Sequence, residues 1–268
     1  MTTPRFQPYA ELCVTSNFTF LTGASHPEEL VTRAAELGLA AIAITDRNSV
    51  AGVVRAYSAL KELARLRDEA QATAEAAQDG PTIRSQRVTD HSSRQTVPHL
   101  PKLIAGARLV LTDSPVEWLA LPTDLTAWSR LTRLLSLGKR RAPKGECHLQ
   151  RADLTEWGQG MVLIALPPDP LDDAHPKTAR SDLLAVARTF PGQCFLGAAP
   201  RYDGRDQSRL DQLAVLAQGA NLPMVAVGDV LMHRAARRPL ADVLTCLRHG
   251  CTIDNIGEHR LANGARRL

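Results

Sequence analysis

Six side chains with useful chemistry follow or end apolar segments, where strands of the fold are expected to finish. They comprise a thiol, a hydroxyl, two carboxylates and two guanidinium groups: Cys13, Thr15, Asp46, Arg47, Arg108 and Asp229. In parallel α/β folds the carboxyl ends of the strands meet at one rim, where sites are built. Thiolates and carboxylates can bind a metal ion, whereas a guanidinium offers only donors and positive charge. The two arginines would therefore repel a metal and could instead pair with Asp46 and Asp229.

Other signals of catalysis are missing from the sequence. It has no Gly-x-Ser-x-Gly elbow, no phosphate-binding loop and no dinucleotide fingerprint. Five histidines stand singly, in the insertion, after the basic segment or in polar surroundings, and isolated histidines are more often surface or capping residues than ligands: His91, His99, His148, His233 and His249. One thiol with two aspartates also falls short of a usual zinc set. We therefore expect no bound metal, no other cofactor and no catalytic residue.

The densest basic segment contains four cations, Lys139, Arg140, Arg141 and Lys144. Such a segment is either a solvated loop or a contact to the phosphates of nucleic acid, and the sequence leaves these alternatives balanced. The net charge of +4 is too mild to decide between them. Aromatic residues make up only 4% of the chain, so the stacking platforms of single-strand binders are not evident.

Residues 39–57 indicate how these side chains are positioned. Residues 39–45 form an apolar run without Gly or Pro, which is typical of a strand buried on both faces. Residues 46–49 have turn and helix-capping chemistry, and apolar residues then return at helical spacing. On local evidence alone, residues 46–49 could equally be a loop with a helix cap and no chemistry.

Apolar and amphipathic segments alternate along the rest of the chain. We expect strands at residues 9–15, 39–45, 103–111, 161–166, 194–199 and 223–227, with a further apolar segment at 118–121. We expect helices from residue 50 and at residues 25–37, 125–135, 181–190, 207–219 and 239–248. Ser25 and Glu28 have the spacing of a capping box at the start of a helix. The alternation predicts a parallel sheet covered by helices, closed or nearly closed into a barrel.

We interpret residues 1–268 as a single domain with an insertion at about 67–100. Residues 68–79 could prolong the preceding helix, but they have little apolar face, and the Ser/Arg/Gln/Thr-rich part after them lacks periodic hydrophobics. We expect this insertion to be disordered or loosely held. The five cysteines form no Cys-x-x-Cys pair, and the sequence has no export signal or membrane span. These features predict a cytoplasmic protein.

Five segments carry a resemblance to a known family: residues 9–30, 43–52, 106–111, 137–149 and 238–253. They resemble the PHP (polymerase and histidinol phosphatase) domain at the N-terminus of bacterial DNA polymerase III alpha subunits. The similarity is greater to the error-prone members used in damage-induced mutagenesis. This resemblance implies an α/β fold, namely a TIM-like, PHP-type distorted (β/α)7 barrel.

The resemblance also assigns positions to a metal site. Active PHP enzymes hold metal ions with a His-x-His on the first strand, a His after a Thr-Asp, an acidic residue after the third strand and an Asp-x-His near the end. Those positions are occupied here by Cys13, Thr15, Asp46, Arg47, Arg108, Asp229 and Leu231. Only the two aspartates match the family's ligands. The resemblance therefore implies a degenerate metal site.

In the family, the nucleotidyl-transfer aspartates belong to a palm domain downstream, which this chain lacks together with the fingers and C-terminal domains. The resemblance implies an excised domain or truncated product that supports translesion DNA synthesis in repair and replication without catalysis of its own. The expected partners are the remainder of the polymerase, DNA contacted weakly through residues 139–144, and other mutagenesis proteins. Two alternatives remain: a metal-dependent phosphoesterase or 3'-5' exonuclease, and a free-standing interaction module.

Overall fold

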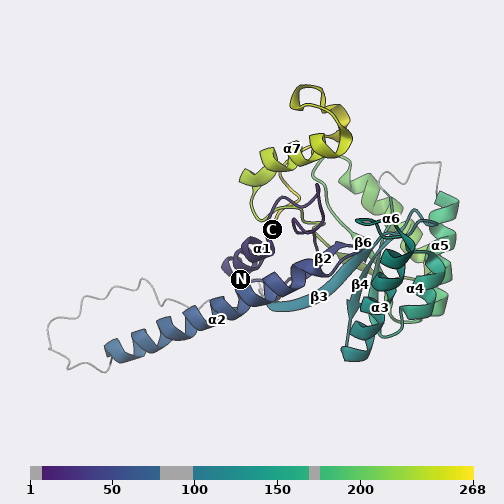
Figure 1. Ribbon diagram of the computed structural model, residues 1–268. Helices are drawn as coiled ribbons and strands as arrows, with labels where there is room; N and C mark the ends of the chain where they lie inside the picture. The colour runs from purple at the N-terminus through teal and green to yellow at the C-terminus, as the bar shows by residue number, and fades with distance from the viewer. Residues whose placement is uncertain (1–7, 79–98, 169–175) are drawn as a thin grey trace, which may run out of the picture.

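One curled sheet organises the protein. The structure, a computed structural model, describes residues 8–78, 99–168 and 176–268. Seven strands follow one another in chain order across the sheet: β1 (Ala10–Val14), β2 (Ala41–Arg47), β3 (Lys102–Leu109), β4 (Glu117–Pro122), β5 (Met161–Leu166), β6 (Cys194–Ala198) and β7 (Met224–Ala226). The curling of the sheet can be followed in Figure 1. The predicted fold class, a TIM-like α/β barrel of the distorted PHP type, is confirmed.

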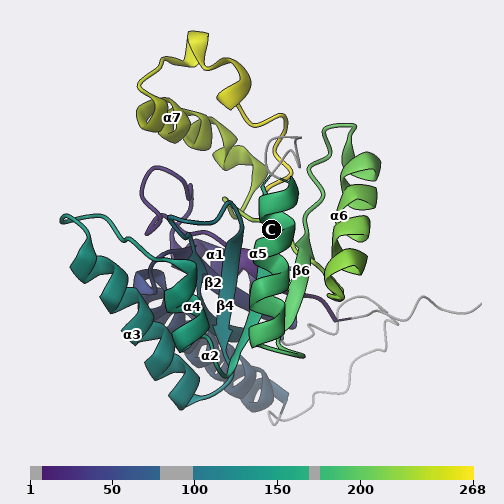
Figure 2. The same cartoon turned by 90° about the vertical axis from the view of Figure 1, so that its right-hand side faces the viewer.

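Helices cover the outside of this sheet and one end of it. They are α1 (Pro27–Glu36), α2 (Ala51–Gln78), α3 (Leu125–Arg141), α4 (Arg151–Trp157), α5 (Pro176–Thr189), α6 (Asp206–Ala220) and α7 (Arg238–His249), with short 3-10 turns at Ala235–Arg237, Ile253–Asn255 and Gly257–His259. In Figure 2, α3, α4, α5 and α6 lie along one side of the sheet, while α7 lies beyond its end. Within the described ranges, none of these helices has the length and apolar character needed to cross a membrane.

The two faces of the curled sheet bury different side chains. Trp118 and Leu163 belong to the large outer core, where the sheet packs against the helices. Leu119, Ile164 and Cys13 belong to a smaller inner core on the concave side. Because neighbouring residues of a strand point to opposite faces, an apolar pair such as 118–119 serves both cores at once. This explains why the strands are apolar throughout.

The prediction of an all-parallel sheet is wrong for one strand. β4 pairs antiparallel with both β3 and β5. Only residues 110–116 connect β3 to β4, which is too short for the helical crossover that a parallel neighbour requires. The connection from β4 to β5 contains two helices, α3 and α4, so the chain returns to the same end of the sheet before β5 begins.

The two edges of the sheet meet through the segment that follows β7. The Thr15 N–H donates to the Val230 carbonyl at 2.9 Å, and the Val230 N–H donates to the Cys13 carbonyl at 2.8 Å. This parallel bridge joins the end of β1 to the chain beside Asp229. Asp229 itself has a φ of 46°, in the left-handed region. The bridge and this turn place the Asp229 carboxylate at the rim of the barrel.

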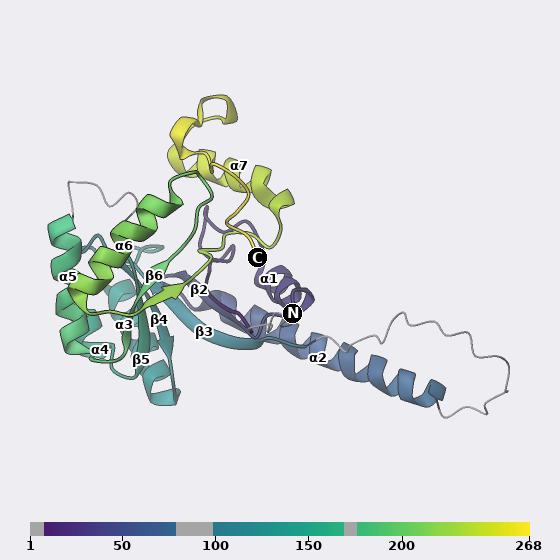
Figure 3. The same ribbon diagram turned by 180° about the vertical axis from the view of Figure 1, so that it is seen from behind.

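Helix α2 extends further than expected. It runs to Gln78, so residues 68–78 prolong the preceding helix, an alternative that the sequence left open although these residues were also predicted to belong to the insertion. Ala, Glu and Gln favour this conformation, and Arg65 adds ion pairs to Glu62 at 2.6 Å and Glu69 at 2.5 Å. Figure 3 shows the far end of α2 projecting from the body. The rest of the predicted insertion, residues 79–98, lies outside the described residues.

The capping box of α1 is displaced by one residue from the predicted position. His26, not Ser25, is the N-cap, and its backbone N–H donates to Glu29 Oε2 at 2.9 Å. Ser25 instead hydrogen-bonds across the fold, since its hydroxyl lies 2.8 Å from Nδ1 of His233. The tertiary contact to His233 therefore uses the hydroxyl that the sequence pattern assigned to a local cap.

Candidate functional site

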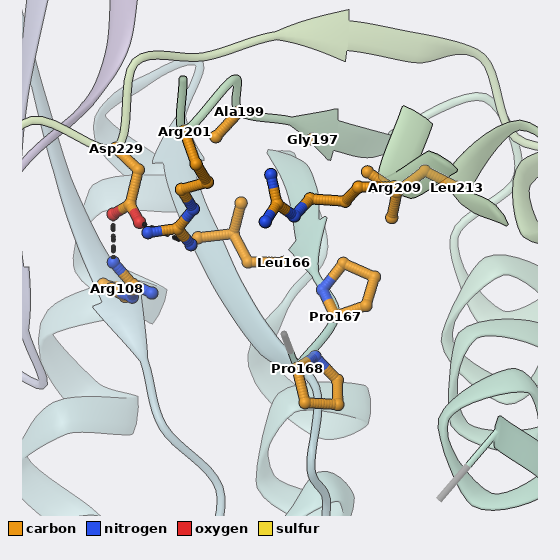
Figure 4. A pocket seen from close by; sticks show the side chains of 10 residues that line it. All are labelled: Arg108, Leu166, Pro167, Pro168, Gly197, Ala199, Arg201, Arg209, Leu213 and Asp229. Carbon is orange, nitrogen blue, oxygen red and sulfur yellow. Dashed lines mark hydrogen bonds and ion pairs between the residues drawn. The ribbon is translucent and has the colours of Figure 1, made fainter. Parts of the chain in front are cut away.

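Asp229 is the centre of the predicted rim. Its Oδ1 accepts from Arg108 Nη1 at 2.7 Å and from the Cys13 thiol at 3.6 Å. Its Oδ2 lies 2.6 Å from Arg266 Nη2 and 3.3 Å from Arg201 Nη2. Figure 4 shows Arg108 and Arg201 converging on this carboxylate around a small cavity of about 50 Å³. Four separate segments of the chain thus meet at one buried aspartate.

The charges around Asp229 fix its ionisation. Burial would raise the pKa of Asp229, but the positive charges of Arg266, Arg108 and Arg201 hold that pKa well below its usual range. Arg108 is also balanced on its other side, where Nε lies 2.5 Å from Glu117 Oε2. Asp229 is therefore an ionised carboxylate whose two oxygens are engaged by cations.

Cys13 and Thr15 occupy β1 and its end, in the positions of the family's first two ligands. Burial, followed by the negative charge of Asp229, raises the pKa of the Cys13 thiol well above its usual range. Zinc binds the thiolate, so an ion at Cys13 would have to displace this proton next to the Asp229 carboxylate. Thr15 is buried, and among the described residues its hydroxyl has no hydrogen-bond partner. A single neutral hydroxyl would add little to a set of metal ligands.

Asp46 holds a loop of the protein. Its Oδ1 accepts from the Ser16 N–H and from the Thr19 hydroxyl, and its Oδ2 accepts from the Ser16 hydroxyl, each at 2.8 Å. Burial raises the pKa of Asp46, and these hydrogen bonds oppose the rise. The side chain of Arg47 does not pair with it, contrary to the expectation; it is exposed and lines a different cleft. Asp46 therefore anchors the connection from β1 to α1.

Leu231 is part of an apolar contact. It is buried in a cluster with Ala24, Met232 and Ala241, which packs α7 against the end of the barrel. A histidine ring at this position would face aliphatic side chains. The residue that stands where the family has a ligand thus contributes packing instead.

Three residues of this region were not predicted from the sequence. Arg201 follows β6 directly, so the rule that sites gather after strands could have found it. Glu11 lies two residues before Cys13, on the same face of β1, and accepts from the Cys13 N–H and the Gly228 N–H. Burial raises the pKa of Glu11. Arg266 lies in the C-terminal segment, where no local pattern indicates a site.

The donor set at this rim does not fit the metal cluster that the family implies. Three guanidinium groups surround Asp229, the thiol of Cys13 is buried and donates to Asp229, and the oxygens of Asp46 are engaged by hydroxyl and backbone donors. Metal ions require lone pairs, and these groups either lack them or have them occupied. Across the described parts of the chain, no three His, Cys, Asp or Glu residues are arranged to hold an ion.

The predicted basic segment divides into two parts. Lys139, near the end of α3, and Lys144, in the loop after it, line an open cleft together with Arg47. Arg141 turns away and lies 2.5 Å from Asp153 Oδ2, in the first turn of α4. Arg140 is exposed and does not line this cleft.

Sequence comparison identifies the domain. The model of the family described as the PHP domain matches residues 11–180. The chain belongs to the PHP domain family. An error-prone DNA polymerase from Ruegeria pomeroyi is 61% identical over 271 residues, which cover 97% of this chain and 23% of that protein. An error-prone DNA polymerase from Rhodopseudomonas palustris is 42% identical over 260 residues, covering 97% of this chain and 20% of that protein.

This PHP domain therefore spans between a fifth and a quarter of the curated relatives that it matches. Solved structures support the fold. A protein described as a metal-dependent phosphoesterase, from Bifidobacterium adolescentis, superposes with a TM-score of 0.53 at 14% identity, covering 84% of this chain and 88% of that chain. An amidohydrolase from Chromobacterium violaceum superposes with a TM-score of 0.50 at 15% identity, covering 83% and 87% of the two chains. At these identities the likeness concerns the fold alone.

Proposed function

We propose that this PHP domain is part of an error-prone DNA polymerase, where it supports the polymerase structurally and has no metal-dependent catalysis of its own. The observation that carries the proposal is the enclosure of Asp229 by Arg108, Arg201 and Arg266. The similarity to error-prone polymerases over nearly the whole chain supports the assignment of the larger protein.

The arginine cluster supports a structural role because of what it connects. Asp229 follows β7, Cys13 lies in β1, Arg108 in β3, Arg201 after β6, and Arg266 near the C-terminus. Removing the partners of a buried ion such as Asp229 is costly, since it leaves a buried charge uncompensated. Where an active relative would use the rim to hold metal ions, this domain uses it to join the edges of its barrel.

The alternative function, a metal-dependent phosphoesterase or 3'-5' exonuclease, has weaker support. It would require Cys13, Asp46 and Asp229 to bind an ion together. The thiol would have to lose its proton beside an anion, and Asp46 would have to give up its hydrogen bonds to residues 16 and 19. Each change is unfavourable, because the buried groups would exchange satisfied partners for desolvated ones.

In the proposed polymerase, nucleotidyl transfer is carried out by other domains of the same chain. Those domains are also the main binding partners of this PHP domain. The cellular context would be translesion synthesis in DNA repair and replication, in the cytoplasm, together with other mutagenesis proteins. The free cysteines of the domain agree with a reducing compartment.

A chimera tests this proposal. This chain would replace the matching region of the Ruegeria pomeroyi polymerase, and primer extension and 3'-end hydrolysis would be followed with manganese present. We expect extension at the rate of the parent polymerase and no hydrolysis attributable to the domain. Manganese-dependent hydrolysis that Asp46→Ala abolishes, in the chimera or in the 268-residue chain alone, would overturn the proposal and establish the enzymatic alternative.

A further inference from the structure

A second cleft lies apart from the Asp229 cavity and shares no lining residue with it. This basic cleft is open, has a volume of about 890 Å³, and is lined by Phe18, Phe20, Arg47, Lys139, Lys144 and Arg248 among others. Its volume is within the roughly 300–1,000 Å³ range of ligand sites. The lining residues come from the connection between β1 and α1, the end of β2, the end of α3 with its following loop, and α7.

The four cations of the basic cleft are available to a ligand. Arg47, Lys139, Lys144 and Arg248 are exposed, and none lies within ion-pair distance of a carboxylate in the described ranges 8–78, 99–168 and 176–268. The acidic residue among those lining the cleft, Glu146, is 3.0 Å from His148 Nε2. This arrangement differs from the rim, where the guanidinium groups are neutralised by Asp229. The cleft therefore presents an uncompensated positive charge to solvent.

Two aromatic rings stand in the same cleft. Phe20 is 83% exposed and Phe18 is 37% exposed, although the chain contains only five phenylalanines. An exposed ring in water loses the burial that usually stabilises it, but it offers a flat surface on which a nucleobase can stack. Such a platform is not evident from composition, because aromatic residues make up only 4% of the chain. Their grouping at one cationic cleft is visible only in the fold.

The loop that carries these rings is held in place by the rim. Thr19, between the two phenylalanines, donates its hydroxyl to Asp46 Oδ1 at 2.8 Å and accepts from the Arg47 N–H at 2.9 Å. On the other side, Arg248 Nη1 donates to the Thr22 hydroxyl at 3.1 Å. A carboxylate at a family metal position thus fixes the loop that presents the aromatic rings.

We propose that the basic cleft binds a segment of single-stranded nucleic acid, with phosphates on the four cations and a base stacked on Phe20. Cations on several separate elements suit successive phosphates of one strand, and every base has a face that can stack. A duplex keeps its bases stacked on one another, so it would forgo the aromatic contact. Which strand binds in the cell rests on the proposed function. The chemistry of binding, phosphates on cations and a base on an aromatic ring, does not depend on it.

Equilibrium binding of fluorescent oligonucleotides to the 268-residue chain tests the proposal. The probes are oligothymidylate, oligouridylate and a DNA duplex, each measured by anisotropy over a series of salt concentrations. Phe20→Ala and Phe20→Leu should each weaken binding of the preferred single strand about tenfold, whereas Phe20→Trp should retain it. Because Phe20 is exposed, these variants should keep the wild-type melting temperature. The preferred single strand identifies the sugar of the natural ligand.

The phosphate contacts are tested by salt dependence. The double variant Lys139→Ala/Lys144→Ala should reduce the magnitude of the negative slope of log affinity against log salt by about 1.4, since each lost contact to a single strand removes about 0.7. Arg140→Ala is the matched control, because Arg140 is an exposed cation of the same helix outside the cleft. Arg140→Ala should change the affinity for the single strand and its salt dependence much less than the double variant does.

Three results would overturn the inference: duplex binding as tight as single-strand binding, unchanged affinity in Phe20→Ala, or an equal effect of Arg140→Ala. These outcomes are independent of the proposed function. If the cleft does not bind a strand, the proposed structural role of the rim is unaffected. If the rim supports manganese-dependent hydrolysis, a Phe20-dependent strand site is equally unaffected.

Discussion

Arg108 Nη1 lies 2.7 Å from Asp229 Oδ1, and this contact joins β3 to the segment after β7. The same guanidinium reaches Glu117 on β4, so one partly buried cation balances two carboxylates. The ion pair occupies the rim where the family places metal ligands. Charge at this rim is therefore satisfied within the protein.

Removing the Arg108 charge should destabilise the domain. Arg108→Met keeps the aliphatic stem but leaves Glu117 without this partner, while Asp229 retains two arginines. We expect the free energy of unfolding to fall by about 2 kcal/mol, the size of a lost hydrogen bond to a charged group. Urea unfolding at neutral pH measures this loss. Arg140→Met is the control and should change stability by no more than about 0.5 kcal/mol; equal effects of the two variants would contradict the assignment.

The ionisation of Asp229 predicts how stability depends on pH. Its pKa in the folded protein is lowered, so its contribution to stability is present above the unfolded pKa of about 3.9 and is lost as pH falls below that value. Below it, stability should fall by about 1.4 kcal/mol per pH unit more steeply in the wild type than in Asp229→Asn. Urea titrations at acidic pH compare the slopes.

Two further results check the role of Asp229. At neutral pH, Asp229→Asn should lose about 3 kcal/mol, because three partly buried guanidinium groups lose their common anion. Asp254→Asn removes an exposed carboxylate for which the described residues provide no ion pair, and its pH profile should follow the wild type. Parallel acid slopes in the wild type and Asp229→Asn would contradict the account.

The packing of Asp46 predicts a requirement for glycine at position 52. A Cβ at Gly52 would lie 2.5 Å from Asp46 Oδ2 and 2.8 Å from the Ser16 hydroxyl. Gly52→Ala should therefore destabilise the domain by about 2 kcal/mol through overpacking, as measured by urea unfolding. Gly219 is the control, since a Cβ there meets its nearest neighbour, Arg180, at 3.4 Å in helix α6. Gly219→Ala should be neutral or stabilising, and an equal loss in both variants would refute the argument.

Much of the fold follows from local pattern. Apolar runs such as residues 39–45 and 161–166 become strands, because they are short and a strand buried on both faces is apolar throughout. The direction of β4 was missed because it depends on the length of its connection rather than on its own composition. Helix α4 was not predicted at all; it is a single short element of residues 151–157.

The site was predictable only in part. Asp229 and Arg108 follow or end strands, so the rule for strand ends places them together. Arg266 joins them from the distant C-terminal segment, which no periodicity reveals. Phe20 and Lys144 share a cleft because the fold brings two loops to one place, and neither residue signals the other in the sequence. Contacts between remote segments are what the sequence alone could not provide.

Metal binding is the measurement that tests the central claim most directly. The 268-residue chain, purified without chelator, would be analysed for zinc and manganese and then titrated with each ion by calorimetry. We predict well below one ion per chain and no saturable heat at the rim. One or more tightly bound ions per chain, lost in Asp229→Ala, would contradict the proposal that arginine side chains take the place of the metal at this rim.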